Sequence, residues 1–238
     1  MRTFGLIGKS LSHSFSSGFF NEKFFKEGIT NTEYLNFELH DISEFTQLIK
    51  THKLSGLNVT LPYKESIIPF LDELSEDAKS IGAVNTIEIV NGKHIGHNTD
   101  IIGFKQSLSP ILDGRDSALI LGDGGAAKAV KSALNQLNIS HKTVSRKGSF
   151  NYSDISIQDI EFNSIIINTT PLGMSSEIEN YPKIPYEVLT EKHLLFDLIY
   201  NPSETLFLKY GRAHKTRTKN GLEMLQIQAE ASWNIWNT

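Results

Sequence analysis

The chain has 238 residues, of which 39% are hydrophobic and 21% are charged, so it is long enough for one large or two modest globular domains and is not expected to be disordered. The net charge is −4 with scattered basic residues, which favours a small-molecule ligand over nucleic acid or a membrane surface. The absence of cysteine excludes disulfides and thiolate chemistry, and the eight histidines form no HExxH pair, so we expect no metal site.

The N-terminal third alternates strands with helices. We expect strands at residues 3–8, 32–39 and 56–61, and helices around 16–27 and 43–52, the second capped by Ser43. This βαβ rhythm predicts a parallel or mixed sheet. Two further alternating strands flank Asn91-Gly92, the dipeptide typical of a β-hairpin. The N-terminal "MRTFGLIG" has no signal-peptide pattern, so we expect a cytoplasmic protein.

A second βα series begins near residue 117. An apolar run at 118–121 meets a glycine-rich turn and then a helix, and further strands are expected at 141–145, 164–168 and 194–200. This order is typical of a nucleotide-binding half-fold. The helix is expected to bury one apolar face, made of Ala126, Val130, Ala133, Leu134 and Leu137. A terminal helix over 220–233 is expected to pack through Leu222, Leu225, Ala229 and Trp233.

The glycine-rich turn favours dinucleotide binding. Gly122, Gly124 and Ala127 fit GxGxx(G/A) between a strand and a helix, the context in which this pattern binds a pyrophosphate at a helix N-terminus. The alternative is an ordinary tight βα turn. Asp123 does not fit the pattern well, because a carboxylate close to two phosphates opposes their binding.

The end of the next expected strand favours NADP over NAD. An acidic residue there binds the ribose 2′-hydroxyl, whereas basic residues accept a 2′-phosphate. This sequence has Ser145, Arg146 and Lys147. The alternative for Arg146 alone is an ordinary solvated arginine in a surface turn.

A lysine and two polar residues converge on the end of another strand. Asn58 and Thr60 share one strand face, and the chain turns at Pro62 to a lysine where a helix is expected to start. Lysine can polarise a carbonyl and protonate the developing alkoxide, and Asp100 is the candidate carboxylate that orients Lys64. The alternatives are a solvated lysine and a helix N-cap aspartate.

Seven motifs carry a family resemblance. They are "SHSFS" (12–16), "NVTLPYKE" (58–65), "GAVNT" (82–86), "NTD" (98–100), "GDGGAA" (122–127), "NTTPLGM" (168–174) and "NGLEMLQIQA" (220–229). In their order and spacing the chain resembles the shikimate dehydrogenases over nearly its whole length. The resemblance implies reversible, NADPH-dependent reduction of 3-dehydroshikimate to shikimate, in the pathway to chorismate and the aromatic amino acids.

The resemblance also implies roles for individual residues. Lys64 and Asp100 would form the catalytic pair. The substrate would be bound by Ser14, Ser16, Asn58, Thr60, Asn85, Tyr200 and Gln228. NADP(H) would be bound by Gly122, Gly124, Gly125, Ala126, Ala127, Ser145, Arg146, Lys147, Thr169 and Gly221. Ser14 and Ser16 have an alternative role as helix N-caps, and Gln228 could instead face solvent.

We therefore expect an α/β protein of two domains. Residues 1–100 would form an α/β substrate domain to which 217–238, with the C-terminal helix, returns, and residues 101–216 would form a Rossmann-like NADP domain. The oligomeric state would be a monomer or a homodimer. Three alternatives remain: an NAD-linked quinate/shikimate dehydrogenase, a non-catalytic metabolite sensor, and an oxidoreductase for another hydroxy acid.

Overall fold

The computed structural model describes residues 1–12, 14–146, 148–174 and 177–238, and the chain divides into two compact units. Unit 1 comprises Met1–Ile102 and Gln228–Thr238, and unit 2 comprises Gly103–Ile227. The boundaries fall inside helix α4 (Asp100–Leu108) and helix α8 (Leu222–Ile235). The substrate and cofactor roles expected for the two domains stay predictions.

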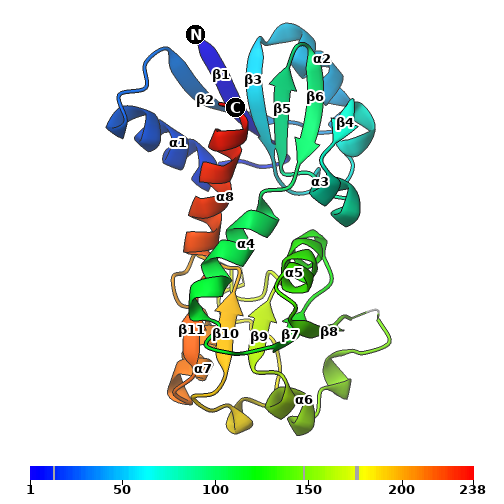
Figure 1. The fold of residues 1–238 in the computed structure, drawn as a ribbon, viewed down its shortest axis with the longest axis vertical. Helices are drawn as coiled ribbons and strands as arrows, with labels where there is room; N and C mark the ends of the chain where they lie inside the picture. Colours follow the sequence, from blue (N-terminus) through cyan, green and yellow to red (C-terminus); the bar gives the residue numbers. More distant parts are fainter. Residues whose placement is uncertain (13, 147, 175–176) are drawn as a thin grey trace. The chain divides into compact units, whose positions relative to one another are not determined.

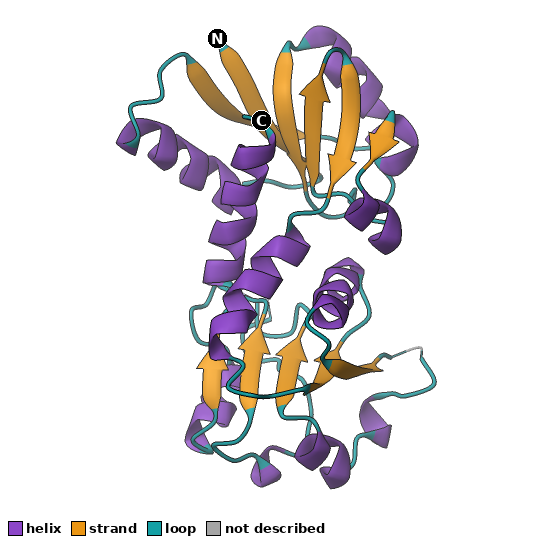
Figure 2. Ribbon diagram, viewed as in Figure 1, coloured by secondary structure: helices purple, strands orange, loops and turns teal. Residues whose placement is uncertain are grey.

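Unit 1 contains a six-stranded sheet (Figures 1 and 2). It is mixed, one of the two arrangements predicted from the sequence, and the short strand β4 was not predicted. Its strands are β1 (Arg2–Gly8), β2 (Thr32–Glu38), β3 (Leu54–Val59), β4 (Glu73–Leu74), β5 (Thr86–Val90) and β6 (Lys93–His97). They lie in the order β2-β1-β3-β5-β6-β4, with β2, β1 and β3 parallel and β5 antiparallel to both its neighbours. The predicted hairpin joins β5 and β6, and Asn91 and Gly92 have φ of 51° and 76°, as a type I′ turn requires.

The side chains of β1 pack in two different hydrophobic cores, one on each face of the sheet. The helices are α1 (Phe15–Lys26), α2 (Phe45–Thr51) and α3 (Glu76–Ile81), with 3₁₀ turns at Ile42–Glu44 and Ile68–Phe70. Phe4 and Leu6 pack with residues of α1 and α8, whereas Ile7 packs with residues of α2 and α3. The prediction that Ser43 caps the second helix is wrong: Asp41 accepts a hydrogen bond from the Ser43 backbone amide and caps the 3₁₀ turn before α2.

The C-terminal part of α8 buries a partly polar stripe. Gln228, Ala229 and Ser232 are buried, whereas Leu222, expected on the packed face, is 38% exposed. The prediction is therefore wrong for Leu222, whereas Ala229 and Trp233 pack in the core as expected. Beyond the helix, the Trp236 ring stacks on Phe4 with ring centroids 4.7 Å apart, and its Nε1 donates to the Ile87 carbonyl oxygen.

Unit 2 contains a parallel five-stranded sheet. Its strands are β7 (Ser117–Leu121), β8 (Ser140–Val144), β9 (Ile165–Asn168), β10 (Leu194–Asp197) and β11 (Arg217–Lys219), in the order β11-β10-β9-β7-β8. Its helices are α5 (Gly125–Gln136), α6 (Ile157–Phe162), α7 (Leu206–Ala213) and most of α4, with 3₁₀ turns at Ser109–Ile111, Tyr152–Asp154 and Tyr186–Val188. This is the Rossmann-like arrangement predicted, although the strand expected over 194–200 ends at Asp197.

The helix that follows the glycine-rich turn packs as an amphipathic helix. Ala127, Ala129, Val130, Ala133 and Leu134 of α5 are buried. Of the expected apolar face, Ala126 and Leu137 are only half-buried, because they lie at its two ends. Among the residues that the structure describes, no helix is long and apolar enough to cross a membrane.

Candidate active site

A lysine and a carboxylate from separate segments of unit 1 form an ion pair. The Lys64 Nζ lies 2.7 Å from Asp100 Oδ2, and the two side chains are 21% and 13% exposed. No helix starts at Lys64, contrary to expectation: residues 61–67 form turns, so Lys64 does not oppose a helix dipole. The Lys64 carbonyl oxygen accepts from the Val84 amide at 2.7 Å, which ties this turn to the segment before β5.

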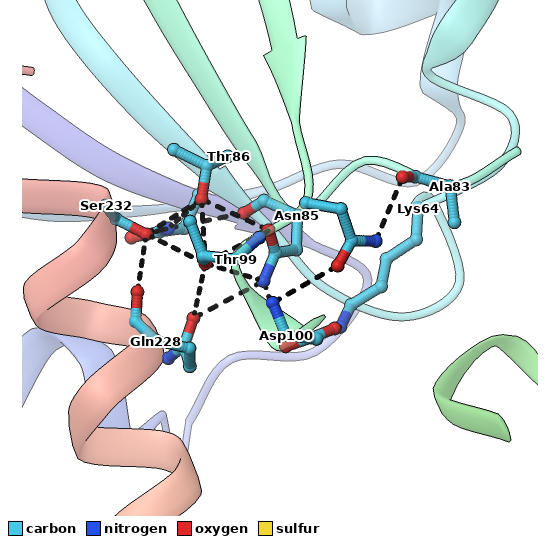
Figure 3. Close-up of polar contacts among 10 residues, drawn as sticks. Lys64, Ala83, Asn85, Thr86, Thr99, Asp100, Gln228 and Ser232 are labelled. Carbon is cyan, nitrogen blue, oxygen red and sulfur yellow. Dashed lines mark hydrogen bonds and ion pairs between the residues drawn. The ribbon is translucent and has the colours of Figure 1, made fainter. Parts of the chain in front are cut away.

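Both oxygens of Asp100 are held by side chains. Oδ2 accepts from Lys64, and Oδ1 accepts from Asn85 Nδ2 at 2.9 Å (Figure 3). Asp100 is the first residue of α4, and its backbone amide donates to Asn98 Oδ1. The carboxylate is therefore oriented toward Lys64 instead of capping the helix, and the solvated-lysine alternative does not describe Lys64.

The ion pair continues into a buried polar network in unit 1 (Figure 3). Asn85 Nδ2 also donates to Thr99 Oγ1 at 3.0 Å and to Gln228 Oε1 at 3.4 Å, and Asn85 Oδ1 accepts from the Thr99 amide. Ser232, one turn beyond Gln228 on α8, lies 2.7 Å from Thr86 Oγ1. Gln228 is thus buried next to Asn85 and does not face solvent.

Asn58 lies at the centre of this network and is only 5% exposed. Its Oδ1 accepts from the Tyr34 hydroxyl at 2.8 Å. Its Nδ2 contacts the Asn85 carbonyl oxygen, Thr86 Oγ1 and Ser232 Oγ at 3.0 to 3.2 Å. These bonds satisfy the amide inside the protein. Asn58 therefore joins the strand ends to α8, and its direct contact with substrate stays a prediction.

The two serines before and inside α1 differ in their partners. Ser14 is at the N-cap position of α1, but its side chain makes no capping bond, and its buried Oγ has no partner in the part of the chain that the structure describes. Burial raises the pKa of Tyr34, and a hydrogen bond with Ser16 opposes this rise. Neither serine side chain caps α1 as its alternative role required, since Ser16 lies within the helix and bonds Tyr34. Thr60, half-buried, directly follows β3.

The glycine-rich loop of unit 2 leaves backbone open at the start of α5. Gly122 has φ of 108°, and a Cβ there would lie 2.7 Å from Thr169 Oγ1. A Cβ on Gly124 or Gly125 would meet nothing within 4 Å, so packing does not explain these glycines. No described side chain caps α5, whose N-cap is Gly124. An open helix N-terminus that a side chain would obstruct fits a pyrophosphate.

The other predicted cofactor residues are placed as follows. Ser145, directly after β8, donates to Asp123 Oδ2 in the glycine-rich loop, and Arg146 beside it is exposed. Lys147 lies outside the described residues. Thr169 Oγ1 donates to the Leu121 carbonyl oxygen at 2.8 Å, so its hydroxyl serves the loop itself.

The cofactor role predicted for Gly221 and the substrate role predicted for Tyr200 are not tested by the structure of unit 2. Gly221 is buried, and a Cβ there would collide with the Leu198 carbonyl group, which explains the glycine by packing alone. Burial raises the pKa of half-buried Tyr200, which lies in unit 2, whereas the other predicted substrate residues lie in unit 1. Their contacts with cofactor and substrate stay predictions.

Comparison with known proteins gives the chain its relatives. Residues 6–87 match the model of the shikimate dehydrogenase substrate binding domain. The "Shikimate dehydrogenase (NADP(+))" of Methanococcus maripaludis is 40% identical, covering 98% of this chain and 90% of the relative. The chain belongs to the shikimate dehydrogenase family.

Solved structures of a shikimate 5-dehydrogenase fusion protein and of a quinate dehydrogenase have the same fold. A chorismate mutase/shikimate 5-dehydrogenase fusion protein from Clostridium acetobutylicum is 38% identical, with a TM-score of 0.89, covering 100% of this chain and 91% of that chain. A quinate dehydrogenase from Corynebacterium glutamicum, in complex with NAD, is 27% identical with a TM-score of 0.90, covering 99% of this chain and 93% of that chain.

Sequence reasoning missed four members of the polar network. Thr86 and Thr99 lie within the motifs that singled out Asn85 and Asp100, so their proximity was a usable signal. Ser232 follows Gln228 by four residues, the spacing that puts two residues on one helix face. Tyr34 gave no signal, because a tyrosine in a strand usually packs in a core. Among the described residues, no three His, Asp or Glu side chains are placed to hold a metal.

Proposed function

We propose that this protein catalyses the reversible, NADPH-dependent reduction of 3-dehydroshikimate to shikimate, with Lys64 and Asp100 as the catalytic pair. The observation that carries this assignment is the 2.7 Å ion pair between these residues, part-buried and continuous with a network of hydrogen-bonding side chains. It is supported by membership of a family whose relatives are named shikimate dehydrogenase (NADP(+)).

Lys64 acts as the proton donor. An ammonium group beside a ketone polarises the carbonyl and protonates the alkoxide that develops during reduction. Asp100 holds the ammonium in place, and Asn85 holds Asp100 through the second carboxylate oxygen. In the reverse direction the lysine takes the proton from the hydroxyl group. Fixing the donor before the reaction lowers the entropic cost of the proton transfer.

The substrate carboxylate and hydroxyl groups bind to side chains of unit 1. The Ser14 hydroxyl suits the carboxylate, since it is buried without a partner among the described residues. Ser16, Thr60, Asn85 and Gln228 supply further donors and acceptors for the hydroxyl groups. Asn58 completes the proposed set in this unit.

The cofactor binds to unit 2. Gly124 and Gly125, at the open N-terminus of α5, would hold the pyrophosphate through their backbone, and Arg146 would hold the 2′-phosphate. When bound, the nicotinamide supplies the hydride for the reduction. Gly122 and Thr169 shape the glycine-rich loop itself, through the close approach of Thr169 to Gly122.

The test is a steady-state assay with 3-dehydroshikimate and NADPH. The Lys64→Ala variant is expected to lower kcat by about 10² to 10⁴-fold, the usual contribution of a positioned proton donor. The control is Lys79→Ala, which removes an exposed lysine of the same unit that pairs with Glu76. Unchanged turnover in Lys64→Ala would refute the catalytic role, and a parent protein inactive on 3-dehydroshikimate would refute the function.

A second candidate is NAD-linked oxidation of quinate. It is favoured by the similarity to the quinate dehydrogenase from C. glutamicum in complex with NAD. Arg146 at the end of β8 argues against it, because a basic residue there favours a 2′-phosphate. Assaying quinate and shikimate, each with NAD and NADP, separates the two candidates, and a large preference for quinate with NAD would favour the second.

A further inference from the structure

The glycine-rich loop carries a carboxylate that the proposed function leaves without a role. Asp123 stands between Gly122 and Gly124, directly before α5, and it is exposed. Its Oδ2 accepts a hydrogen bond from Ser145 Oγ, although the two residues lie 22 positions apart in the chain. Ser145 itself is 6% exposed. The carboxylate is therefore held at the end of β8 instead of extending freely into solvent.

Sheet register explains why these two residues meet. Strands β7 and β8 are adjacent and parallel, with Leu121 opposite Val144, so the chain leaves both strands at the same edge. The Gly122 amide donates to the Val144 carbonyl oxygen at 2.9 Å, which brings the next residues of the two loops together. In a dinucleotide-binding βαβ unit, this second strand end is where the adenosine ribose is recognised.

Opposite charges meet at this strand end. Arg146 directly follows Ser145 and is exposed. Burial raises the pKa of Tyr152 to about 12, and the Arg146 charge lowers this pKa while the Asp123 charge raises it. Both charges thus act on one phenol of the neighbouring 3₁₀ turn. A group bound at this strand end meets a cation and an anion together.

We propose that Asp123, held by Ser145, is a specificity-determining residue that recognises the adenosine ribose and limits the preference for NADP(H) over NAD(H). The inference rests on the proposed function, which places the adenosine ribose at this strand end. The carboxylate accepts hydrogen bonds from ribose hydroxyls, as the acidic residue of NAD-binding proteins does. It repels a 2′-phosphate, a monoester that carries a charge of about −1.5 to −2 at neutral pH.

The Ser145 hydroxyl is the point of competition. Its single proton is directed to Asp123 Oδ2 in this structure, and the same proton would be needed to donate to a 2′-phosphate. Arg146 attracts the phosphate while Asp123 opposes it. Both cofactors are therefore accepted, and the discrimination between them is smaller than the basic residue alone would give.

The test measures binding without turnover. Isothermal titration calorimetry of the full chain with 2′,5′-ADP and with 5′-AMP gives the ratio of two affinities that differ by the 2′-phosphate. In Asp123→Asn, 2′,5′-ADP is expected to bind about 10-fold more tightly and 5′-AMP about threefold more weakly, because the charge repulsion is lost and a neutral amide oxygen replaces the charged acceptor of the ribose hydroxyls. Asp123→Ala, which removes the acceptor altogether, is expected to change the ratio in the same direction.

The control is Glu191→Gln. It makes the same charge change on an exposed residue of unit 2, but Glu191 precedes β10 at the opposite edge of the parallel sheet. It is expected to leave the ratio unchanged. If both Asp123 variants bind the nucleotides with the parent's ratio, the inference is overturned and the cofactor assignment stands. If the parent binds neither nucleotide nor NADPH, the cofactor part of the proposed function falls, and this inference falls with it.

Discussion

Replacing Asp197 by asparagine is expected to change how the stability of unit 2 depends on pH. Asp197 ends β10 and is fully buried. Its Oδ1 accepts from the Ile199 amide and Asn168 Nδ2, both at 3.0 Å, and its Oδ2 accepts from Thr205 Oγ1 at 2.6 Å. Burial raises the pKa of Asp197 to about 6, against the opposing effect of these three hydrogen bonds.

The direction of the pH dependence follows from the pKa of Asp197 in the folded state compared with that in the unfolded state. The folded pKa of about 6 lies above the ordinary aspartate pKa of 3.8, so between these pH values the folded state holds a proton that the unfolded state has lost. The contribution to stability is present below the lower value and is lost as pH rises through the higher one. A difference of about 2 in pKa corresponds to about 3 kcal/mol, most of it lost between about pH 4 and pH 7.

The Asp197→Asn variant cannot ionise, so its free energy of unfolding relative to the parent is expected to rise by about 2 to 3 kcal/mol from about pH 4 to about pH 7. Asparagine lacks the second oxygen, which accepts from Thr205 in the parent. This loss lowers the free energy of unfolding of the variant by a similar amount at pH 4 and at pH 7. Hydrogen exchange in urea, read on peptides that cover β9 and β10, measures unit 2 by itself.

Asp159→Asn is the matched control in the same unit. Burial tends to raise the pKa of Asp159, but hydrogen bonds from Lys142 and Ser156 outweigh it and lower the pKa to about 2. The contribution of Asp159 is therefore lost only as pH falls below the usual range of a carboxyl group, and its variant should differ from the parent by a constant amount at higher pH. A parent-to-Asp197→Asn difference that is equally flat would refute the reasoning.

Two further predictions concern unit 1. Ser232→Ala removes a fully buried hydroxyl that bonds Asn58, so it is expected to cost about 1 to 3 kcal/mol of stability and to raise KM for 3-dehydroshikimate. Thermal melting and steady-state kinetics measure these effects, with Ser80→Ala, at an exposed serine, as the control. An unchanged melting temperature in Ser232→Ala would contradict the prediction. Gly92→Val forces a β-branched residue to φ near 76° and is expected to cost about 1 to 3 kcal/mol. Calorimetry against Gly18→Val, at an exposed helical glycine with open space around it, tests that prediction, which fails if both variants melt together.

Local chemistry made much of the fold predictable. Asn91-Gly92 specified a hairpin because both residues tolerate positive φ, and the apolar run before Gly122 specified a buried parallel strand. The prediction for α8 failed at Leu222 and left out the polar part of the buried face. Its buried stripe includes Gln228 and Ser232, and polar residues are expected inside only when a partner is known. That partner, Asn85, comes from a distant segment that periodicity does not reveal.

The catalytic residues of the site were predictable because they lie in short sequence motifs. Lys64 and Asp100 were paired from the chemistry of ketone reduction and the family resemblance, and the structure brings them into contact. The internal role of Asn58 was not predictable, because sequence does not show whether an amide on a strand face meets a ligand or Tyr34 and Ser232. Asp123 was recognised as discordant, but its bond to Ser145 depends on the register of β7 and β8.

The contacts of Arg2 and Gly56 with residues 236–237 affect when unit 1 can finish folding. The Arg2 side chain bonds the Trp236 carbonyl oxygen and Asn237, and Trp236 packs where Gly56 leaves room for its ring. Domains generally fold during synthesis as soon as their residues are available. Unit 2 is one continuous segment, so a ribosome delivers it whole before the last residues of unit 1 exist. The synthesis of unit 1 thus starts before that of unit 2 and finishes after it, and nascent chains stalled before Gln228 should display an unfinished unit 1.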